Sequence, residues 1–419
     1  MKHRSIALLL VLILIAPFAR AADLALKPND TVAVCGDSIT EQKEYSVFIE
    51  DYLLMCQPAA SIRAAQFGWG GETSWGFLGR MANDVLWLNP SVATTCYGMN
   101  DGGYGPLNPD RAKQYKNAQR GIVQLFKGAN TRVIIVGSPG CVDADTSFRG
   151  NTEQAAVYNK TLASLRDIAQ ETARQEGVLF ANVYDPMIDA MTKAKAKYGK
   201  QYHLAGGDGV HPAKNGQLVM AYAYLKAMGC DGNIGTFTVD LKANATASEG
   251  HKILSSQNGS LELESSRYPF CFFGNPSDPN ATTGVIEFLP FNDDLNRLTL
   301  IVKNANADRL KITWGNTTKE FPASALEKGI NLAAEFLDNP FCDQFKKVEQ
   351  TIRTQQNYET PLHKQLLHDL PMYQNAVPEE SESIARIAAA VQKKDAALAA
   401  ASSAAVTPVK HTIKIEPVK

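Results

Sequence analysis

The chain has 419 residues, of which 45% are hydrophobic and 20% are charged, and its formal net charge is −1. This is the composition of an ordinary globular protein, and its length predicts two or three structural units. A charge so close to zero gives no reason to expect nucleic acid or an anionic membrane as a partner.

The N-terminus has the pattern of a secretory signal peptide over residues 1–21. A basic start at 2–4, an apolar core at 6–16 and an A-x-A cleavage site at 19–21 follow one another. The apolar core is shorter than the roughly 20 residues that span a bilayer, which favours a cleaved signal over a retained anchor. We therefore expect a secreted protein, periplasmic or extracellular, with no stable membrane insertion after cleavage.

The seven cysteines are scattered along the chain and contain no C-x-x-C pair. Cys35 and Cys96 fall within apolar strand patterns and are predicted to be buried thiols. The odd number excludes complete intramolecular pairing, although Cys271 and Cys342 could form a bridge in an oxidising compartment. The spacing implies no metal site.

Apolar runs alternate with helical patterns through the region 22–230. This alternation predicts an α/β fold with a parallel sheet covered by helices on both faces. The predicted strands are 31–35, 62–67, 91–97, 132–137 and 178–184. The predicted helices are 43–56, 74–88, 110–127, 152–176, 187–198 and 214–228.

The pattern changes after residue 230. Short alternating runs in 231–322 predict a β-rich accessory domain, a small antiparallel sandwich. Residues 323–419 are predicted to form a helical extension whose Ala-, Lys- and Glu-rich part is either a solvated helix or a flexible linker. The predicted strands are 234–241, 260–265, 284–290, 297–303 and 309–314, with 411–415 as a possible final strand.

Ser38 lies where the first apolar strand ends, in the sequence G-D-S-I-T at 36–40. Ligands of open α/β sheets bind outside the carboxyl ends of the strands, so a hydroxyl there is a candidate nucleophile. A serine nucleophile needs a base to remove its proton and donors that stabilise the oxyanion.

An acid and an imidazole follow the last predicted strand in D-G-V-H-P at 208–212. His211 is the candidate general base for Ser38, and Asp208 would accept the other ring N–H and fix the tautomer. Alone, this motif is typical of a turn before a helix. Its combination with Ser38 favours a catalytic triad.

Two further loops follow the second and third strands. They offer the backbone N–H of Gly71 and the side-chain amide of Asn100, which together with the N–H of Ser38 would form an oxyanion hole of three donors. Asp37 and Trp69 adjoin these loops and are the candidate substrate-binding residues. The aspartates 143 and 145, after the fourth strand, are expected to be solvated.

Four ordered segments resemble the conserved blocks of the SGNH, or GDSL-type, serine hydrolase superfamily. They are G-D-S-I-T at 36–40, G-G-E-T at 70–73, G-M-N-D at 98–101 and D-G-V-H-P at 208–212. The resemblance covers roughly residues 30–228 and implies a flavodoxin-like α/β/α sandwich with esterase activity and without metal or organic cofactor. The chain departs from the family pattern at Gln66-Phe67, where relatives often carry Asn.

Carried over position by position, the resemblance implies Ser38, Asp208 and His211 as the triad, with Ser38, Gly71 and Asn100 as oxyanion donors. The leading hypothesis is a secreted serine esterase that removes O-acetyl groups from a carbohydrate or polysaccharide. One alternative is a lipid-directed esterase or lysophospholipase. Another, from a different class, is a glycan- or envelope-binding protein that uses its C-terminal region as the binding module. The oligomeric state stays open.

Overall fold

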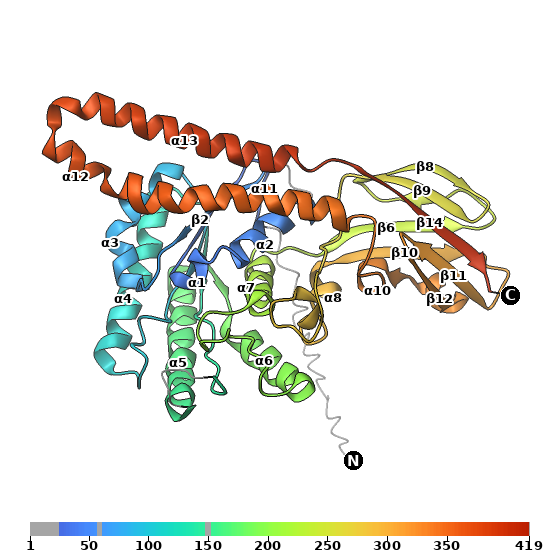
Figure 1. The fold of residues 1–419 in the computed structure, drawn as a ribbon, viewed down its shortest axis with the longest axis horizontal. Helices are drawn as coiled ribbons and strands as arrows, with labels where there is room; N and C mark the ends of the chain where they lie inside the picture. The colour runs from blue at the N-terminus through green and yellow to red at the C-terminus, as the bar shows by residue number, and fades with distance from the viewer. Residues whose placement is uncertain (1–24, 57–60, 147–151, 419) are drawn as a thin grey trace, which may run out of the picture.

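The structure is a computed structural model that describes residues 25–56, 61–146 and 152–418 (Figure 1). The predicted signal peptide at 1–21 lies outside these residues. An α/β unit occupies the first half of the chain, and two further sheets and a long helical hairpin follow it. Within the described residues, no helix has both the length and the apolar composition needed to cross a bilayer.

The first sheet has five parallel strands in the order β2-β1-β3-β4-β5. The chain turns from β1 to β2 on one side and then to β3 on the other, so the order reverses between β1 and β3. Such a reversal opens a crevice at the carboxyl ends of the two strands. The strands are β1 (Thr31–Gly36), β2 (Arg63–Gly68), β3 (Val92–Cys96), β4 (Val133–Gly137) and β5 (Leu179–Ala181).

Alternate residues of β1 enter different cores. Ala33 and Cys35 belong to the core beneath α3, α4 and α5, whereas Val32 and Val34 belong to the core shared with α2, α6 and α7. The predicted α/β/α sandwich is therefore confirmed. Its helices are α1 (Ser38–Glu41), α2 (Tyr45–Asp51) with η1 (Tyr52–Cys56), α3 (Ser74–Asp84) with η2 (Leu86–Leu88), α4 (Pro109–Gly128), α5 (Thr152–Glu176), α6 (Tyr184–Tyr198) and α7 (Lys214–Ala227).

Two smaller sheets follow, in the orders β13-β10-β6-β7 and β12-β11-β14-β9-β8. They pack face to face, since the Phe237 ring on β6 lies 5.0 Å from His251 on β8 and 6.0 Å from His411 on β14. The elements are β6 (Asn233–Asp240), β7 (Thr246–Ala247), β8 (His251–Gln257), β9 (Ser260–Ser265), η4 (Thr282–Gly284), α8 (Phe291–Leu295), β10 (Arg297–Lys303), β11 (Arg309–Trp314), β12 (Thr317–Pro322), α9 (Ala323–Lys328), β13 (Ile330–Asn331) and α10 (Leu332–Glu335).

This region differs from the prediction in several places, among them the strands β8 and β12, which the sequence did not predict. β6 and β10 pair in parallel, because the chain builds β8 and β9 of the other sheet before it returns. The predicted strand at 284–290 is wrong. Its apolar residues Val285 and Leu289 are buried, but they lie in turns, and the Phe288 N–H donates to Val285 O at 2.9 Å. The alternation of apolar and polar residues at 284–290 therefore belongs to a buried loop and not to a strand.

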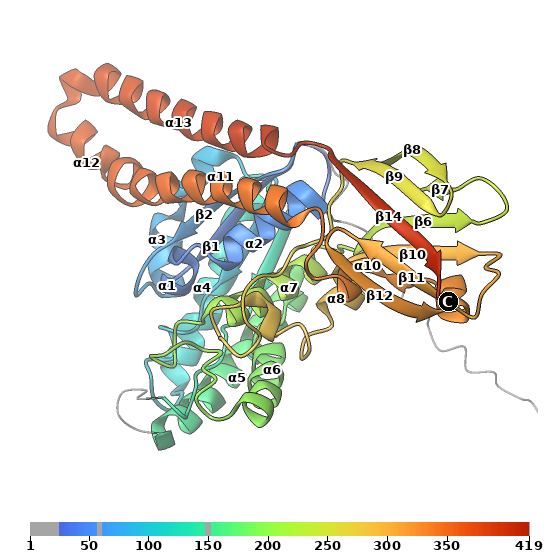
Figure 2. The same cartoon turned by 45° about the vertical axis from the view of Figure 1, so that its right-hand side comes forward.

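Helices α11 to α13 (342–404), which we call the C-terminal helical arm, run along the edge of the first sheet in both views (Figures 1 and 2). The Ala-rich segment is a helix, as in the first of the two predicted alternatives, and is mostly exposed; its buried residues are Ile384, Asp395, Ala399 and Ser402. The last strand, predicted as a possible strand at 411–415, lies between β9 and β11 in the sheet β12-β11-β14-β9-β8. The arm comprises α11 (Cys342–Pro361), η5 (Leu362–Leu367), α12 (His368–Ala376), η6 (Pro378–Glu380) and α13 (Ser381–Ala404), and the strand is β14 (Val409–Pro417).

The arm covers the edge of β2 that has no neighbouring strand. Gln355 Nε2 donates to Ala64 O at 2.9 Å, and the Gln66 N–H donates to Glu359 Oε2 at 2.8 Å. Edge strands present unpaired backbone groups that proteins must cover or blunt. Side chains of α11 thus take the place of a sixth strand.

Candidate active site

Ser38 begins α1 directly after β1, at the crevice between β1 and β3. Asp37 caps this short helix, since its Oδ1 accepts the Ile39 N–H at 2.9 Å. Burial raises the pKa of Asp37 to about 7, and the residue is 2% exposed. Asp37 therefore fixes the turn that presents the Ser38 hydroxyl.

The three predicted triad side chains form one hydrogen-bonded chain. Ser38 Oγ lies 2.8 Å from His211 Nε2, and His211 Nδ1 lies 2.6 Å from Asp208 Oδ2. Each ring nitrogen of the imidazole therefore has one partner, the hydroxyl on one side and the carboxylate on the other. A carboxylate that accepts a hydrogen bond from Nδ1–H keeps the proton on Nδ1 and leaves Nε2 free to take the proton of the hydroxyl.

The loop that carries Asp208 and His211 is tightly constrained. Asp208 Oδ1 accepts the backbone N–H groups of Val210 and His211, each at 2.9 Å. Burial alone would raise the pKa of Asp208, but the hydrogen bonds from His211 hold it below its usual value. Gly206 has φ +83°, and a Cβ there would lie 1.8 Å from His211 O, so only glycine fits.

A second loop, which carries Asp143, contacts the loop of Asp208 and His211. Asp143, which we expected to be solvated, is fully buried. Its N–H donates to Gly209 O at 2.9 Å, and its carboxylate accepts from Lys195 and contacts His203 Nδ1 at 3.0 Å. The expectation was wrong because Lys195 and His203 provide partners for the buried carboxylate, which sequence spacing does not show.

The predicted oxyanion donors lie on the two loops beside Ser38. Asn100 Nδ2 donates one hydrogen to Glu72 O at 3.0 Å, and Tyr104 Oη donates to Asn100 Oδ1 at 3.0 Å. These two bonds orient the amide and leave its second hydrogen for a ligand. Gly71 is exposed with φ +74°, a left-handed conformation that favours glycine.

We call residues 69–72 the oxyanion loop. Glu72 anchors it to the domain through a two-pronged ion pair, with Arg80 Nε at 2.6 Å and Arg80 Nη2 at 2.7 Å. Tyr97 Oη also donates to Glu72 at 2.9 Å, and Arg80 donates to Phe67 O at 2.9 Å. Burial raises the pKa of Glu72, although the Arg80 hydrogen bonds oppose that shift.

The comparison with protein families agrees with this geometry. The GDSL-like Lipase/Acylhydrolase family matches residues 34–219. These residues include Ser38, the oxyanion loop, Asn100, Asp208 and His211. This domain belongs to that family. The GDSL domain accounts for the first sheet and its helices, while the two smaller sheets and the C-terminal helical arm lie outside the match.

Solved structures share the fold. A gut microbial diltiazem-metabolizing enzyme is 21% identical, with a TM-score of 0.72 over 94% of this chain and 98% of its own. The alignment therefore extends beyond the GDSL domain into the C-terminal sheets and helices. At this identity the similarity concerns the fold alone.

Other solved structures align with about half of this chain. A putative GDSL-like lipase from Parabacteroides merdae is 20% identical, with a TM-score of 0.42 over 49% of this chain and 98% of its own. An acetylxylan esterase from Geobacillus stearothermophilus is 19% identical, with a TM-score of 0.40 over 48% of this chain and 95% of its own. No curated protein matches the chain.

Trp69, predicted to contact substrate, is surrounded by side chains of the protein itself. Arg80 Cζ lies 4.8 Å, Lys364 Nζ 4.9 Å and the His368 ring 4.9 Å from its ring centre. Two of these partners come from the C-terminal helical arm. The sequence analysis did not find Lys364, and no local signal marks it, because it lies far from the motifs along the chain.

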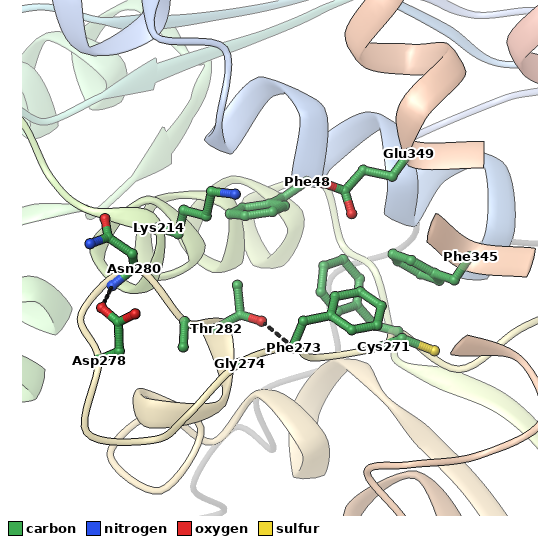
Figure 3. Close-up of a pocket in the computed structure, with 12 residues that line it drawn as sticks. Phe48, Lys214, Cys271, Phe273, Gly274, Asp278, Asn280, Thr282, Phe345 and Glu349 are labelled. Carbon is green, nitrogen blue, oxygen red and sulfur yellow. Dashed lines mark hydrogen bonds between the residues drawn. The ribbon is translucent and has the colours of Figure 1, made fainter. Parts of the chain in front are cut away.

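A cavity of about 150 Å³ lies between the GDSL domain and the C-terminal region (Figure 3). It opens beside Lys214, which begins α7 three residues after His211, and aromatic rings form its walls. The triad does not line it. Its lining residues are Phe48, Lys214, Phe270, Cys271, Phe273, Gly274, Asp278, Asn280, Ala281, Thr282, Phe345 and Glu349.

All seven cysteines are buried free thiols, including Cys35 and Cys96 as predicted. Cys271 and Cys342 are not bridged, and Cys342 Sγ donates to Leu337 O at 3.4 Å. Among the residues described, no group of three or more His, Cys, Asp or Glu side chains is arranged to hold a metal ion.

Proposed function

We propose that the protein is a secreted serine ester hydrolase that removes O-acetyl groups from a carbohydrate through an acyl-enzyme. The observation that carries the proposal is the chain from Ser38 Oγ to His211 Nε2 and from His211 Nδ1 to Asp208. Membership of the GDSL-like lipase/acylhydrolase family supports hydrolysis of an ester.

In the first half of the reaction His211 removes the Ser38 proton as Oγ attacks the ester carbonyl. The positive imidazolium that forms is stabilised by Asp208 at 2.6 Å. The carbonyl oxygen becomes an oxyanion, which the N–H groups of Ser38 and Gly71 and the free amide hydrogen of Asn100 stabilise. His211 then returns the proton to the departing alcohol.

The second half repeats these steps with water. His211 removes a proton from water, the hydroxide attacks the acyl carbon, and the same three donors stabilise the second oxyanion. Collapse of this intermediate releases the acid and returns the proton to Ser38 Oγ. Each residue therefore acts twice, and the protein supplies all the groups that move protons.

The polar character of the site supports a short acyl group. The loops that carry the proposed donors and the partners of Ser38 contain Gly70, Gly71, Asn100 and Asp208, and these residues offer no broad apolar wall for a long chain. The carbohydrate and the secretion are proposed from the signal-peptide pattern at 1–21 and from the additional C-terminal sheets.

Ser38→Ala and His211→Ala test the proposed triad. We expect each to lower kcat for para-nitrophenyl acetate by at least about 10⁴-fold, with the far-UV circular dichroism and the melting temperature retained. Activity near that of the wild type in either folded variant would contradict the assignment.

The acyl group and the alcohol are tested separately. Rates on acetyl, butyryl and octanoyl aryl esters should fall steeply with chain length, whereas a lipid-directed esterase would prefer octanoyl. Release of acetate from a panel of acetylated polysaccharides should then identify the carbohydrate. If no member of the panel yields acetate while aryl acetate is hydrolysed, the carbohydrate part of the proposal fails.

A further inference from the structure

The oxyanion loop lies against a part of the chain that is outside the GDSL domain. Lys364, on the π-helical segment η5 of the C-terminal helical arm, donates to Glu41 Oε1 at 2.6 Å. Its ammonium also lies 4.9 Å from the centre of the Trp69 ring, within the range of a cation–π contact. The arm therefore places a positive charge at the beginning of this loop.

Glu41 joins three parts of the molecule. It is the last residue of α1, the helix that begins with Ser38. Its Oε1 accepts from Lys364, and its Oε2 accepts the Gly70 N–H at 2.6 Å. One carboxylate thus links the nucleophile's helix, the oxyanion loop and the C-terminal helical arm.

The Gly70 bond matters because the next N–H in the chain is the proposed donor of Gly71. Glycine has the greatest backbone freedom of all residues, and two successive glycines can point this peptide in many directions. Both residues are exposed, so packing does not hold them. An oxyanion donor is effective only when it is already oriented before the charge develops.

The arm is attached beside the loop at a second point. Thr360 Oγ1 accepts from Gln66 Nε2 at 2.8 Å and from Lys43 Nζ at 3.3 Å. Gln66 Oε1 in turn accepts the Gly68 N–H at 3.0 Å, one residue before the oxyanion loop. Gln66 is where family members often carry Asn, and here its longer side chain reaches the arm.

The helix is irregular where it meets the loop, since residues 362–367 form a π-helical segment, and Pro371 disturbs the hydrogen bonding just after that segment. Pro371 has no N–H to donate to Leu367 O, and its ring disfavours a regular turn at that carbonyl. Asn83 Nδ2 of α3 donates to Leu367 O at 3.0 Å instead. The π-helical segment ends at Leu367, and such segments are frequent at functional sites.

We propose that Lys364 is a positioning residue, which acts through Glu41 to orient the Gly71 N–H, so that the C-terminal helical arm completes the active site. This inference rests on the proposed ester hydrolysis. It gives the region beyond the GDSL domain a part in turnover, in place of a separate binding role.

Lys364→Met tests the inference, because methionine keeps an unbranched chain and removes the ammonium. We expect kcat for para-nitrophenyl acetate to fall by about 10- to 100-fold, less than the loss of a whole donor, with KM changed less than about threefold. Lys364→Arg should restore most of kcat, since a guanidinium can also donate to Glu41. Lys393→Met, at an exposed lysine of α13, is the matched control and should behave as the wild type.

Wild-type kcat in folded Lys364→Met would overturn the inference, as would an equal loss in Lys393→Met. If Lys364→Met does not fold, Glu41→Gln decides: it retains an acceptor for Gly70 but loses the ionic partner, and a normal kcat there contradicts the proposal. The proposed function fails separately, when the wild type does not hydrolyse the ester or Ser38→Ala hydrolyses it as well as the wild type.

Discussion

The oxyanion loop is held on two sides by ion pairs that differ in burial. On its inner side, Glu72 and Arg80 both belong to the GDSL domain, and each side chain is 7% exposed. On its outer side, Glu41 and Lys364 join the domain to the C-terminal helical arm, and they are 26% and 24% exposed. Both pairs have closest N···O distances of 2.6 Å.

Because the two ion pairs differ in burial, we expect the inner pair to affect mainly stability and the outer pair to affect mainly catalysis. A buried pair that loses one partner leaves an uncompensated charge in the protein, which is costly, whereas a partly exposed pair is screened by water. We therefore expect the inner pair to be needed for folding. We expect the outer pair to adjust the loop with little effect on the free energy of unfolding.

Arg80→Met should have the largest effect on stability. It leaves Glu72 buried with only the Tyr97 hydroxyl, so the free energy of unfolding should fall by about 3–5 kcal/mol. Lys364→Met should lower it by less than about 1 kcal/mol. Urea denaturation of both variants checks the contrast, and equal losses would refute the distinction between the two sides.

Asn100→Ala should have the largest effect on turnover within the oxyanion hole. It removes the side-chain donor, and we expect kcat for aryl acetate to fall by about 10²–10³-fold. Steady-state kinetics should show this loss exceeding that of Lys364→Met, since one variant deletes a donor and the other only misplaces one. The reverse order would contradict the roles given to the two residues.

The contact between the GDSL domain and the C-terminal helical arm should respond to pH through Glu50. Burial raises the pKa of Glu50 to about 7, against the hydrogen bonds from Gln356 and Gln355 of the arm. A carboxyl whose pKa is higher in the folded state favours folding when protonated, so stability should decrease as pH rises from about 4.5 to 7. The loss is at most about 3 kcal/mol.

Glu50→Gln removes this titration and should make the stability profile between pH 5 and 8 less steep. It does not abolish the slope, because burial also raises the pKa of Asp51 and of Glu359 beside it. Thermal melts at several pH values measure the profile. A profile as steep as that of the wild type would show that other groups govern the pH dependence of the arm.

Ser402→Ala should have the smallest effect. The buried Ser402 hydroxyl donates to Gln355 Oε1 at 2.9 Å and helps to orient the glutamine that covers β2. We expect a loss of about 1 kcal/mol in the free energy of unfolding and an unchanged kcat. Ser403→Ala, on the exposed side of the same helix, is the control. Equal stability of both variants would show that the bond from Ser402 to Gln355 does not stabilise the packing of the arm on β2.

The sequence was sufficient where local pattern and chain order carry the information. Apolar strands end in polar segments, and parallel strands place those ends at one edge, so Ser38 and Asn100 could be assigned to one crevice before the structure. His211, which follows α6, was joined to Ser38 by the motif at 208–212. The same reasoning found the final strand and most helix boundaries. These features depend on residues close together in the chain.

The contacts missed are those made across long separations. Lys364 lies 323 residues from Glu41, and nothing around it distinguishes it from a solvated lysine of a polar helix. Asp143 was predicted to be solvated because its partners Lys195 and His203 come from other parts of the chain. The role of a charge depends on what packs against it, and that is set by tertiary structure.

Covalent labelling of Ser38 tests the central claim most directly. An alkyl fluorophosphonate should react once with the wild type at the Ser38 peptide, measured by intact mass and peptide mapping. Ser38→Ala should remain unlabelled and His211→Ala should label far more slowly. Absence of an adduct on the wild type, or equal labelling of Ser38→Ala, would contradict the assignment of Ser38 as the activated nucleophile.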